Sequence, residues 1–341
     1  MSLGRSFGEL AGAVTLAAGL MLASLPAVAL PDWPGSSWQA TLLRAHPLVG
    51  TIWDARAATR VMGETVVARL EAARHRLIGE IHDNPDHHRI QAWLVGAMHR
   101  TGGSGTVVFE HIRADQAGAL AQFVASPAAD RSTARLFDLL DWDKSGWPPR
   151  ALFQPLFAAV LDKGLSIVPG DAARASVRSV ARQGGAALDA PEQARLALAE
   201  GLPELEQAAL LDELEASHCG LMPRTAFGGM ALAQRYRDAH LARAMVDAAA
   251  VGPVILIAGN GHVHAGRGVP WHLARMTPDA AIVTVALIEV MDGKTDAAAA
   301  VPKDAAGNPA ADFVIFTPRV DRDDPCVAMR RAFAPKPQSK P

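Results

Sequence analysis

The chain has 341 residues, of which half are hydrophobic and a fifth are charged, and its formal net charge is −2. This balance is typical of an ordinary globular protein and excludes the strongly basic surface that nucleic-acid binding requires. The length suits one large domain or two small ones, and no internal repeat is visible.

The N-terminus has the organisation of a secretory signal. Arg5 precedes an apolar run over residues 10–25, and an A-x-A cleavage site follows at 27–29. We therefore expect a Sec-type signal peptide over 1–29 and a periplasmic or envelope-associated protein. The apolar run is nearly long enough to span a bilayer, so an uncleaved anchor is the alternative. No cysteine follows the run, which argues against a lipoprotein.

Strand and helix signals then alternate along the chain. Residues 30–50 are punctuated by Pro and Gly and are expected to be extended. Asn84 and Pro85 are the expected N-cap and first residue of a helix. Strands are expected at 76–81, 107–109, 166–168, 254–258, 281–290 and 312–317, and helices at 61–73, 84–99, 114–140, 150–162 and through most of 172–250. A low-complexity loop covers 292–310, and the tail from 331 is expected to be disordered.

This alternation predicts an α/β fold with a largely parallel central sheet flanked by helices. The long helical stretch at about 172–250 is expected to form an insertion or cap over the strand ends. We expect a single domain over 30–330, between the signal peptide and the tail at 331–341.

The two cysteines, Cys219 and Cys326, are the only ones in the chain. In an exported protein such a pair suggests one disulfide, which would tie the C-terminal segment to the body. Two unrelated buried thiols are the alternative. A metal site is disfavoured because no C-x-x-C spacing is present.

Several predicted strands run directly into polar residues that can perform chemistry. Ligands of open parallel sheets bind beyond the carboxyl ends of the strands, so these residues predict one shared site. They are Glu80, His82, Glu110, His111, Asp171, Asn260 and His262.

The motif GEIHDNPDHH (79–88) is the densest of these segments. Glu80 and His82 are two residues apart and therefore point to the same side of an extended chain. Imidazole and carboxylate together bind transition metals or haem iron, or act as acid and base. The alternative is that His82 only supports the turn. His87 and His88 are not expected to face the site together.

Two further segments add candidates. The glycines around His262 in GNGHVHAGRGVP (259–270) allow a ligand to approach the backbone closely. Glu110 needs a metal, an arginine or a histidine as its partner, and a structural ion pair is the alternative. Tyr236, the only tyrosine, shares a helix face with His240; both residue types bind ferric haem, although ordinary packing is the commoner explanation.

Other site classes are excluded by missing motifs. The chain has no G-x-S-x-G elbow, no H-E-x-x-H helix and no C-x-x-C-H haem attachment site. The segment at 259–270 is neither a dinucleotide fingerprint nor a P-loop, because its glycine spacing is wrong and no Lys-Ser/Thr pair ends it.

Taken together, the motifs resemble the ChaN-like haem-binding uptake family of bacterial exported proteins, within the Tiki/TraB/erythromycin-esterase superfamily. The matching segments are GEIHDNPDHH (79–88), VVFEH (107–111), LDWDKSGWP (140–148), QRYRDAHLARAM (234–245), GNGHVHAGRGVP (259–270) and FTPRVDRDDPC (316–326). The resemblance spans about 50–326. It implies the superfamily's α/β fold, haem binding in iron acquisition, a homodimer whose interface holds two haems, and outer-membrane haem-uptake components as partners.

The resemblance also implies roles for particular residues. Within the superfamily, the positions that match His82, Glu110 and His262 hold metal or perform hydrolysis. The chain departs from the family at two points, because it lacks the lipobox cysteine of several members and has Gly170-Asp171 where an asparagine is expected after the third strand.

Three functions remain open at this stage. An exported haem-binding protein is favoured, with haem held by residues from the set Tyr236, His82, His88, Asn260 and His262. The alternative is a divalent-metal-dependent hydrolase of peptidase or esterase type, with metal ligands His82, Glu110 and His262. The catalytic residues of an enzyme would be Glu80, His82, Glu110, His262, Arg237 and Asp238. A non-catalytic binding protein with a vestigial polar cluster is the third possibility.

Overall fold

The structure is a computed structural model that describes Met1 and residues 30–100 and 104–333. The predicted signal peptide and most of the predicted tail lie outside these residues. Within the described part of the chain, no helix combines the length and the hydropathy needed to cross a bilayer.

All strands of the described residues lie in one sheet, in the order β2-β1-β8-β7-β3-β6-β4-β5. The strands from β8 to β5 run parallel, whereas β1 and β2 add an antiparallel edge beside β8. The strands are β1 (Ile52–Asp54), β2 (Thr59–Val61), β3 (His75–Ile78), β4 (Thr106–Arg113), β5 (Ser166–Asp171), β6 (Val254–Ile257), β7 (Ile282–Glu289) and β8 (Phe313–Thr317). The predicted α/β class with a largely parallel central sheet is confirmed.

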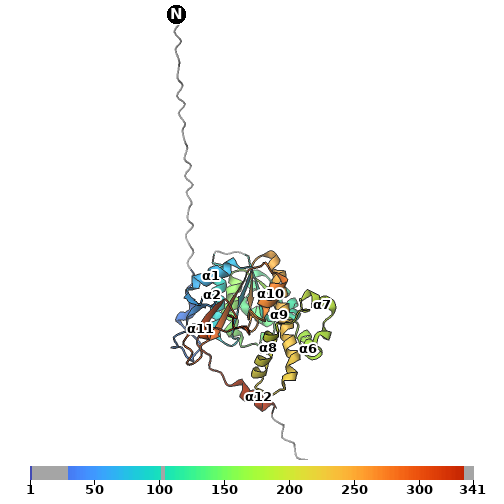
Figure 1. Ribbon diagram of the computed structural model, residues 1–341. Coiled ribbons are helices and arrows are strands. Elements are labelled where there is room, and N and C mark those ends of the chain that lie inside the picture. Colours follow the sequence, from blue (N-terminus) through green and yellow to red (C-terminus); the bar gives the residue numbers. More distant parts are fainter. Residues whose placement is uncertain (2–29, 101–103, 334–341) are drawn as a thin grey trace, which may run out of the picture.

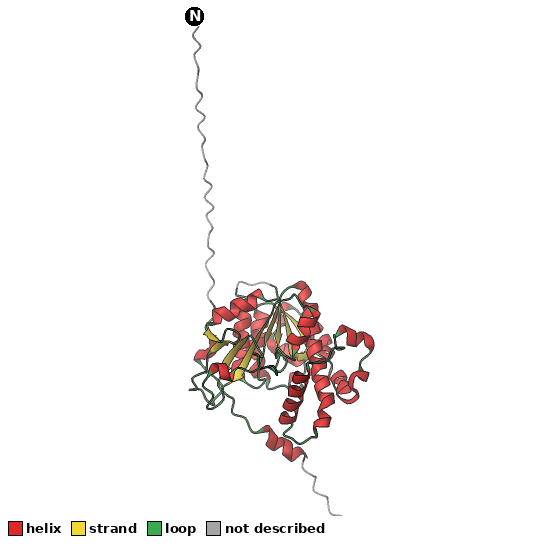
Figure 2. Ribbon diagram, viewed as in Figure 1, coloured by secondary structure: helices red, strands yellow, loops and turns green. Residues whose placement is uncertain are grey.

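Helices cover both faces of this sheet (Figures 1 and 2). On one face, α1 to α5 form the largest apolar core with the strands. On the other face, α9 and α10 pack on β3, β4 and β6, and α6 to α8 lie outside α9. The helices are α1 (Gly63–Ala72), α2 (Pro85–Met98), α3 (Ala117–Ala125), α4 (Thr133–Leu139), α5 (Arg150–Asp162), α6 (Arg174–Gln183), α7 (Ala190–Arg195), α8 (Glu204–Ser217), α9 (Phe227–Ala248), α10 (Val269–Met276), α11 (Ala297–Ala300) and α12 (Pro325–Phe333).

The central strands are apolar on both sides because both sides are covered. Successive residues of a strand point to opposite faces. In β3, Leu77 joins the core under α9, whereas its neighbour Ile78 joins the core under α1 to α5. β4 alternates in the same way, so its continuation sends consecutive side chains to opposite faces. This alternation decides where the polar residues at the strand ends lie.

The turn between β3 and α2 is fixed by its capping residues. The Asn84 side chain accepts a hydrogen bond from the Asp86 backbone N–H at 3.0 Å, and Pro85 occupies the first helical position, as predicted. This cap fixes the start of α2 directly after the segment that carries Glu80 and His82.

The structure differs from the predicted elements mainly at the edges of the sheet. β1 and β2 were not predicted, because each has only three residues and β2 is largely exposed. β4 continues to Arg113, so Glu110 and His111 lie inside the strand rather than after it. α12 extends to Phe333, so the first residues of the tail expected to be disordered are helical, and α11 interrupts the predicted loop at 292–310.

Candidate functional site at the carboxyl edge of the sheet

Polar side chains from four neighbouring strands meet at the carboxyl edge of the sheet, as predicted. The strands β3, β6, β4 and β5 lie side by side, and α9 packs against the last three of them. The residues that meet here are Glu80 after β3, Glu110 and His111 in β4, Asp171 at the end of β5, His262 after β6, and Arg237 and Asp238 on α9.

On the α2 and α5 side of the sheet, Glu80 is the centre of a buried cluster. Its Oε1 accepts hydrogen bonds from His82 Nδ1 at 2.7 Å and His111 Nε2 at 2.8 Å, and its Oε2 accepts one from Gln91 at 2.8 Å. His88 Nδ1 lies 3.3 Å from the same Oε2. Burial alone would raise the pKa of Glu80, but His111 and His88 hold it well below its usual range. We call Glu80, His82, His88, Gln91 and His111 the Glu80 cluster.

On the α9 side, Glu110 is the centre of a second buried cluster. Its Oε1 accepts from Arg237 at 2.8 Å and lies 3.1 Å from His262 Nε2, and its Oε2 accepts from the Gly259 backbone N–H at 2.7 Å. Arg237 also binds both carboxylate oxygens of Asp171. Burial alone would raise the pKa of Glu110, but His262 and Arg237 hold it well below its usual range.

His262 lies between two carboxylates. Its Nδ1 binds Asp238 Oδ1 at 2.6 Å, and its Nε2 faces Glu110. Burial lowers the pKa of this imidazole, but Glu110 and Asp238 outweigh burial and raise it to about 10. At neutral pH His262 is therefore an imidazolium. We call Glu110, Asp171, Arg237, Asp238 and His262 the Glu110 cluster.

His82 connects the two clusters and is their most accessible histidine. Its Nδ1 is bound to Glu80, whereas its Nε2 lies 3.9 Å from Glu110 Oε1, too far for a hydrogen bond. The side chain is 35 % exposed, and its ring packs edge-on against Trp147. A Cβ on Gly259 would lie 3.0 Å from the ring, so this glycine permits the close approach that the sequence suggested for the 259–270 segment.

Two of the predicted haem-binding residues direct their side chains into the protein, although only His88 is fully buried and Asn260 is partly buried. His88 is fully buried against Phe153, its Nε2 binds the His82 carbonyl oxygen at 2.9 Å, and its Nδ1 faces Gln91 and Glu80. Asn260 donates from its side chain to the Leu287 carbonyl at 2.7 Å, and its Oδ1 is buried without a hydrogen-bond partner in the described part of the chain.

Tyr236 is separated from both clusters. Its ring packs with α6 residues in a small apolar core. It borders an open cavity of about 710 Å³ between α6, α7 and α9. Burial raises the pKa of the phenol, so the neutral form is favoured. Tyr236 and His240 share a helix face as predicted, with ring centres 6.2 Å apart, and His240 Nδ1 lies 3.1 Å from the Gly170 carbonyl oxygen near the end of β5.

The C-terminal segment is fastened at two points. Arg322 binds Asp83, the residue after His82, at 2.7 Å and also Glu289 at 2.7 Å. Cys326 forms the expected disulfide with Cys219, which follows α8.

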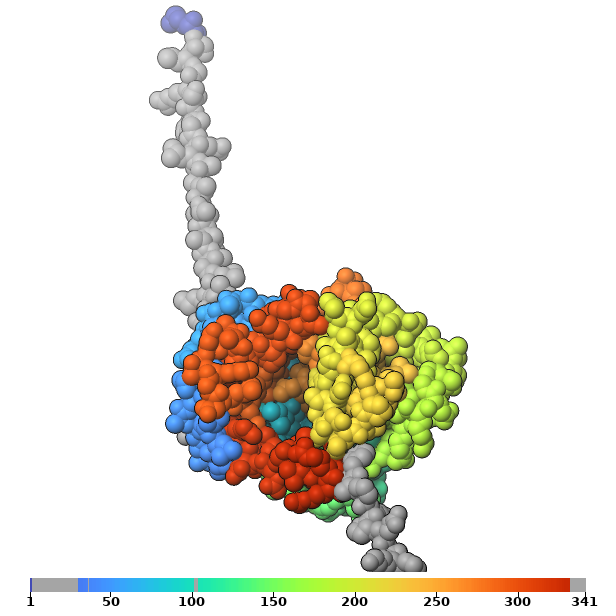
Figure 3. All heavy atoms as spheres, turned by 60° about the horizontal axis from the view of Figure 1, so that its bottom comes forward, coloured from blue at the N-terminus to red at the C-terminus, as the bar shows by residue number. Residues whose placement is uncertain are grey.

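Figure 3 shows a hollow in one face of the molecule. Its rim is formed by C-terminal segments, coloured red and orange, and by the segment around residues 200–235, coloured yellow. Teal atoms, from the chain around residues 90–110, lie inside it.

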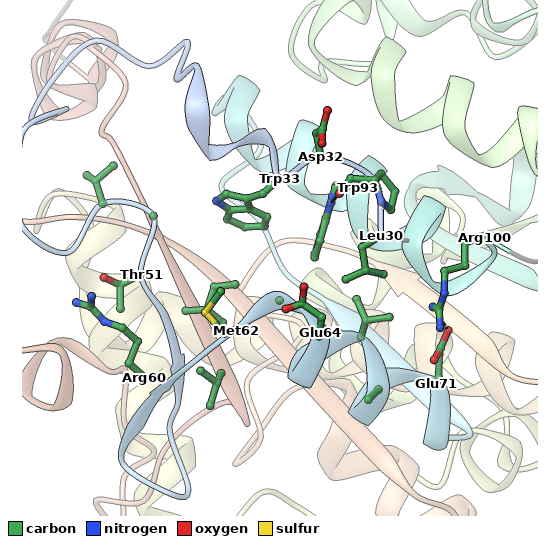
Figure 4. A pocket seen from close by; sticks show the side chains of 18 of the residues that line it. Leu30, Asp32, Trp33, Thr51, Arg60, Met62, Glu64, Glu71, Trp93 and Arg100 are labelled. Atoms are coloured by element: carbon green, nitrogen blue, oxygen red, sulfur yellow. Dashed lines mark hydrogen bonds and ion pairs between the residues drawn. The ribbon is translucent and has the colours of Figure 1, made fainter. Parts of the chain in front are cut away.

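A cavity far from the clusters lies between the N-terminal segment, the β1–β2 edge and α1 (Figure 4). Its volume is about 890 Å³, and its walls include Trp33, Trp93 and Met62. Trp33 and Trp93 meet edge to face with ring centres 4.9 Å apart. No histidine, tyrosine or cysteine lines this cavity. It is therefore spacious but lacks the imidazole groups found at the strand ends.

The metal set expected from the sequence is only partly assembled. His82, Glu110 and His262 are neighbours, but Glu110 already binds Arg237, and both nitrogens of His262 face carboxylates. Among the described residues, the three acidic or imidazole groups whose ligand atoms lie within 4.8 Å of one another are Glu80, His82 and His111. Glu80 and His111 are fully buried and hydrogen-bonded to each other, so an ion would have to displace existing hydrogen bonds.

His111 follows Glu110 in β4, and the alternation of a strand sends it to the opposite face, into the Glu80 cluster. Two members of the site are missing from the predicted set. Gln91 is one turn after His87 on α2, and Gln234 lies one turn before Asp238 on α9. The helical spacing of these glutamines was the only available signal.

Comparison with known proteins identifies relatives of the chain. A family model described as haem-binding uptake, Tiki superfamily, ChaN matches residues 66–273. None of the curated proteins matches the sequence. Among solved structures, ChaN of Campylobacter jejuni, determined with cofacial haem binding, is 20% identical, with a TM-score of 0.59 over 77% of this chain and 95% of that one. A mutant of the erythromycin esterase EreC in its open conformation is 13% identical, with a TM-score of 0.43 over 82% and 99%.

Proposed function

Because the chain belongs to the ChaN family of haem-binding uptake proteins in the Tiki superfamily, we propose that it binds haem at the carboxyl edge of its sheet. The observation that carries this proposal is the extent of the family match, since residues 66–273 include both strand-end clusters. We further propose that the protein acts in haem or iron uptake, in the periplasm or at the cell envelope.

The histidine best suited to meet haem iron is His82. An axial ligand needs an open nitrogen that an iron can approach, and often donates its other ring N–H to a carboxylate. His82 combines both properties, because its Nδ1 is bound to Glu80 and its Nε2 has no hydrogen bond. His88 and His262 lack an open nitrogen. Among the histidines of the two clusters, His82 is therefore the one that fits as a ligand of haem iron.

Tyr236 fits the same role less well. Its phenol is held neutral by burial and lies among apolar side chains, whereas ferric haem binds tyrosine as the phenolate. The open cavity beside it keeps Tyr236 as the second candidate ligand. Asn260 fits the role of a haem contact less well, because its side-chain amide already donates to the Leu287 carbonyl oxygen.

Location and partners are further parts of the proposal. The Cys219–Cys326 disulfide supports an oxidising compartment such as the periplasm. A homodimer is supported by the haem pair of the Campylobacter jejuni protein, since cofacial haems must be brought together. Outer-membrane haem-uptake components are the partners that this role requires.

Titration of the purified protein with haem, followed by absorbance, tests the proposal. We expect a saturable Soret band whose position shifts in His82→Ala and stays the same in Tyr236→Phe. His218→Ala is the matched control, because this partly exposed histidine lies after α8 and outside both clusters. A Soret band that shifts in Tyr236→Phe and not in His82→Ala would identify Tyr236, beside the cavity between α6, α7 and α9, as the iron ligand. Absence of saturable binding would refute the haem function.

A hydrolase is the second candidate, and the position of His82 is the observation that favours it. An imidazole oriented by a carboxylate, with its other nitrogen open, is the arrangement of a general base. His82 could take a proton from water at Nε2, and Glu80 would stabilise the resulting imidazolium. The divalent-metal version with His82, Glu110 and His262 is less favoured, because Arg237 already neutralises Glu110.

The hydrolase is tested with a panel of aryl esters and short peptides in the presence and absence of a chelator, together with metal analysis. Turnover that survives the chelator and disappears in His82→Ala would support proton chemistry. Turnover that requires bound metal and is lost in both His82→Ala and His262→Ala would restore the metal-dependent version. Absence of turnover in both conditions would exclude the hydrolase for these substrates.

A further inference from the structure

A smaller cavity adjoins the two clusters on the β5 side. Its volume is about 340 Å³, and its walls include Arg113 from β4, Trp147 from the loop before α5, and Arg174 from the start of α6. Asp171 and Arg237 also line it, so Arg237 has Glu110 on one side and this cavity on the other. Two members of the Glu110 cluster thus form part of the cavity wall.

The charges of this cavity are strongly unbalanced. Three arginines line it against one acidic residue, Asp171, and both oxygens of that carboxylate are already bound to Arg237. Arg174 hydrogen-bonds only to the Ser145 carbonyl oxygen at 2.6 Å, and within the described residues it has no acidic partner. Arg113 binds Asp115, but this pair is partly exposed and therefore weak.

The start of α6 adds to the positive potential. This ten-residue helix begins at Arg174 on the wall of the cavity, and no side chain caps its first turn. Unpaired N–H groups and the helix dipole favour an anion at such a position. In the 890 Å³ cavity beside α1 the lining charges are instead mixed, with Asp32, Glu64 and Glu71 beside two arginines. An anionic ligand is therefore expected in the small cavity and not in the large one.

Trp147 links the cavity to His82. Its indole lines the cavity, packs against the His82 ring at 4.9 Å between ring centres, and donates a hydrogen bond to the His111 carbonyl at 3.1 Å. Val177 adds an apolar surface on the α6 side. A ligand with a flat apolar body beside Trp147 could therefore reach His82 with one part and the arginines with another.

We propose that this cavity is a carboxylate subsite, in which Arg113 and Arg174 bind an acidic side chain of a ligand whose apolar body lies beside Trp147. The proposal deepens the proposed haem function and rests on it, since haem carries two propionates on an apolar ring. Guanidinium groups suit this task because they bind carboxylate oxygens in pairs.

The test compares haem with haem dimethyl ester, in which the propionates are masked. In the double variant Arg113→Gln/Arg174→Gln we expect the affinity for haem to fall about ten- to a hundredfold, with the affinity for the ester unchanged. Arg178→Gln is the matched control, because this arginine is exposed one turn further along α6 and does not line the cavity. An unchanged haem affinity in the double variant, or an equal loss for both ligands, would overturn the subsite.

A second probe separates the subsite from the haem function. If the wild-type protein binds no haem, 3-phenylpropionate and phenyl phosphate are titrated and the tryptophan indole N–H signals are followed by NMR. Saturable binding of phenylpropionate that is lost in the double variant would support the subsite although haem is not the ligand. Tighter binding of phenyl phosphate would overturn the carboxylate assignment, and absence of binding by either compound would overturn the subsite.

Discussion

The Glu80 and Glu110 clusters both contain a buried carboxylate, but the partners that compensate its charge differ. Glu80 is surrounded by three histidines and a glutamine, all of which can change protonation, tautomer or amide orientation. Glu110 is held by Arg237, which cannot lose its proton, and by His262, which stays protonated to about pH 10. The first cluster is therefore adjustable, and the second is a fixed arrangement of charges.

This difference between an adjustable and a fixed cluster indicates separate functions for the two sides of the sheet. His82 belongs to the adjustable cluster and has its free nitrogen directed toward the fixed one. A group that must bind a ligand or exchange a proton benefits from partners that can follow its change of state. The fixed cluster supplies a constant electrostatic environment and joins α9 to the strand ends.

The same substitution in both clusters gives the largest expected effect. Glu110→Gln should lower the free energy of unfolding by about 3 kcal/mol, because the buried His262 imidazolium and the partly buried Arg237 lose the carboxylate that they share and keep only Asp238 and Asp171. Glu80→Gln should cost about 1–2 kcal/mol, because His82 and His88 can lose protons and Gln91 can reverse its amide. Urea unfolding of both variants at pH 7 measures the difference.

Equal losses in the two variants would contradict the distinction between a fixed and an adjustable cluster. Arg150→Gln serves as a control for the method, because this arginine pairs with exposed carboxylates and its loss should leave the free energy of unfolding nearly unchanged.

The pH dependence of stability sharpens the comparison with a smaller effect. The pKa of His262 is about 10 in the folded protein, against an ordinary value of 6.5. Its contribution to stability is therefore fully present below pH 6.5 and is lost as the pH rises from there through about 10. In His262→Gln, the decline in the free energy of unfolding between pH 6.5 and 10 should be shallower than in the wild type.

His272 is a control whose contribution to stability has the opposite pH dependence. It is fully buried without a hydrogen-bond partner among the described residues, and burial lowers its pKa to about 3. Its contribution is present above pH 6.5 and is lost as the pH falls toward 3, so His272→Phe should change only the acid limb. An unaltered alkaline limb in His262→Gln would show that this imidazole is not held between two ionised carboxylates.

The sequence predicted the centre of the sheet well because buried parallel strands are continuous apolar runs. It also predicted that Glu80, Glu110 and His262 would come together, since parallel strands present their carboxyl ends at one edge. β1 and β2 were not predicted because three residues are too few to show a strand period, and β2 is also largely exposed. β1 is placed by pairing with β8, and β2 by pairing with β1, which sequence pattern alone does not reveal.

The sequence could not decide which face each side chain occupies. Tyr236 and Arg237 are adjacent on α9, but one helical step of 100° places the first against α6 and the second between Glu110 and Asp171. Likewise, Glu110 and His111 are adjacent in β4 and enter different clusters. Such assignments require the packing of distant elements, because helix and strand periodicity give relative directions only.

The smallest effect concerns the contact that positions His82 between the clusters. In Gly259→Ala, the added methyl group would lie 3.0 Å from the His82 ring, which must move by a few tenths of an ångström. Stability should change by no more than about 1 kcal/mol, since the backbone angles there suit alanine. Haem affinity should fall about tenfold, because the movement displaces the proposed ligand nitrogen. Gly261→Ala is the matched control in the same loop, with no atom near the added methyl. Equal affinities of the two variants would show that the position of His82 Nε2 does not govern binding, and would move the search for the iron ligand toward Tyr236.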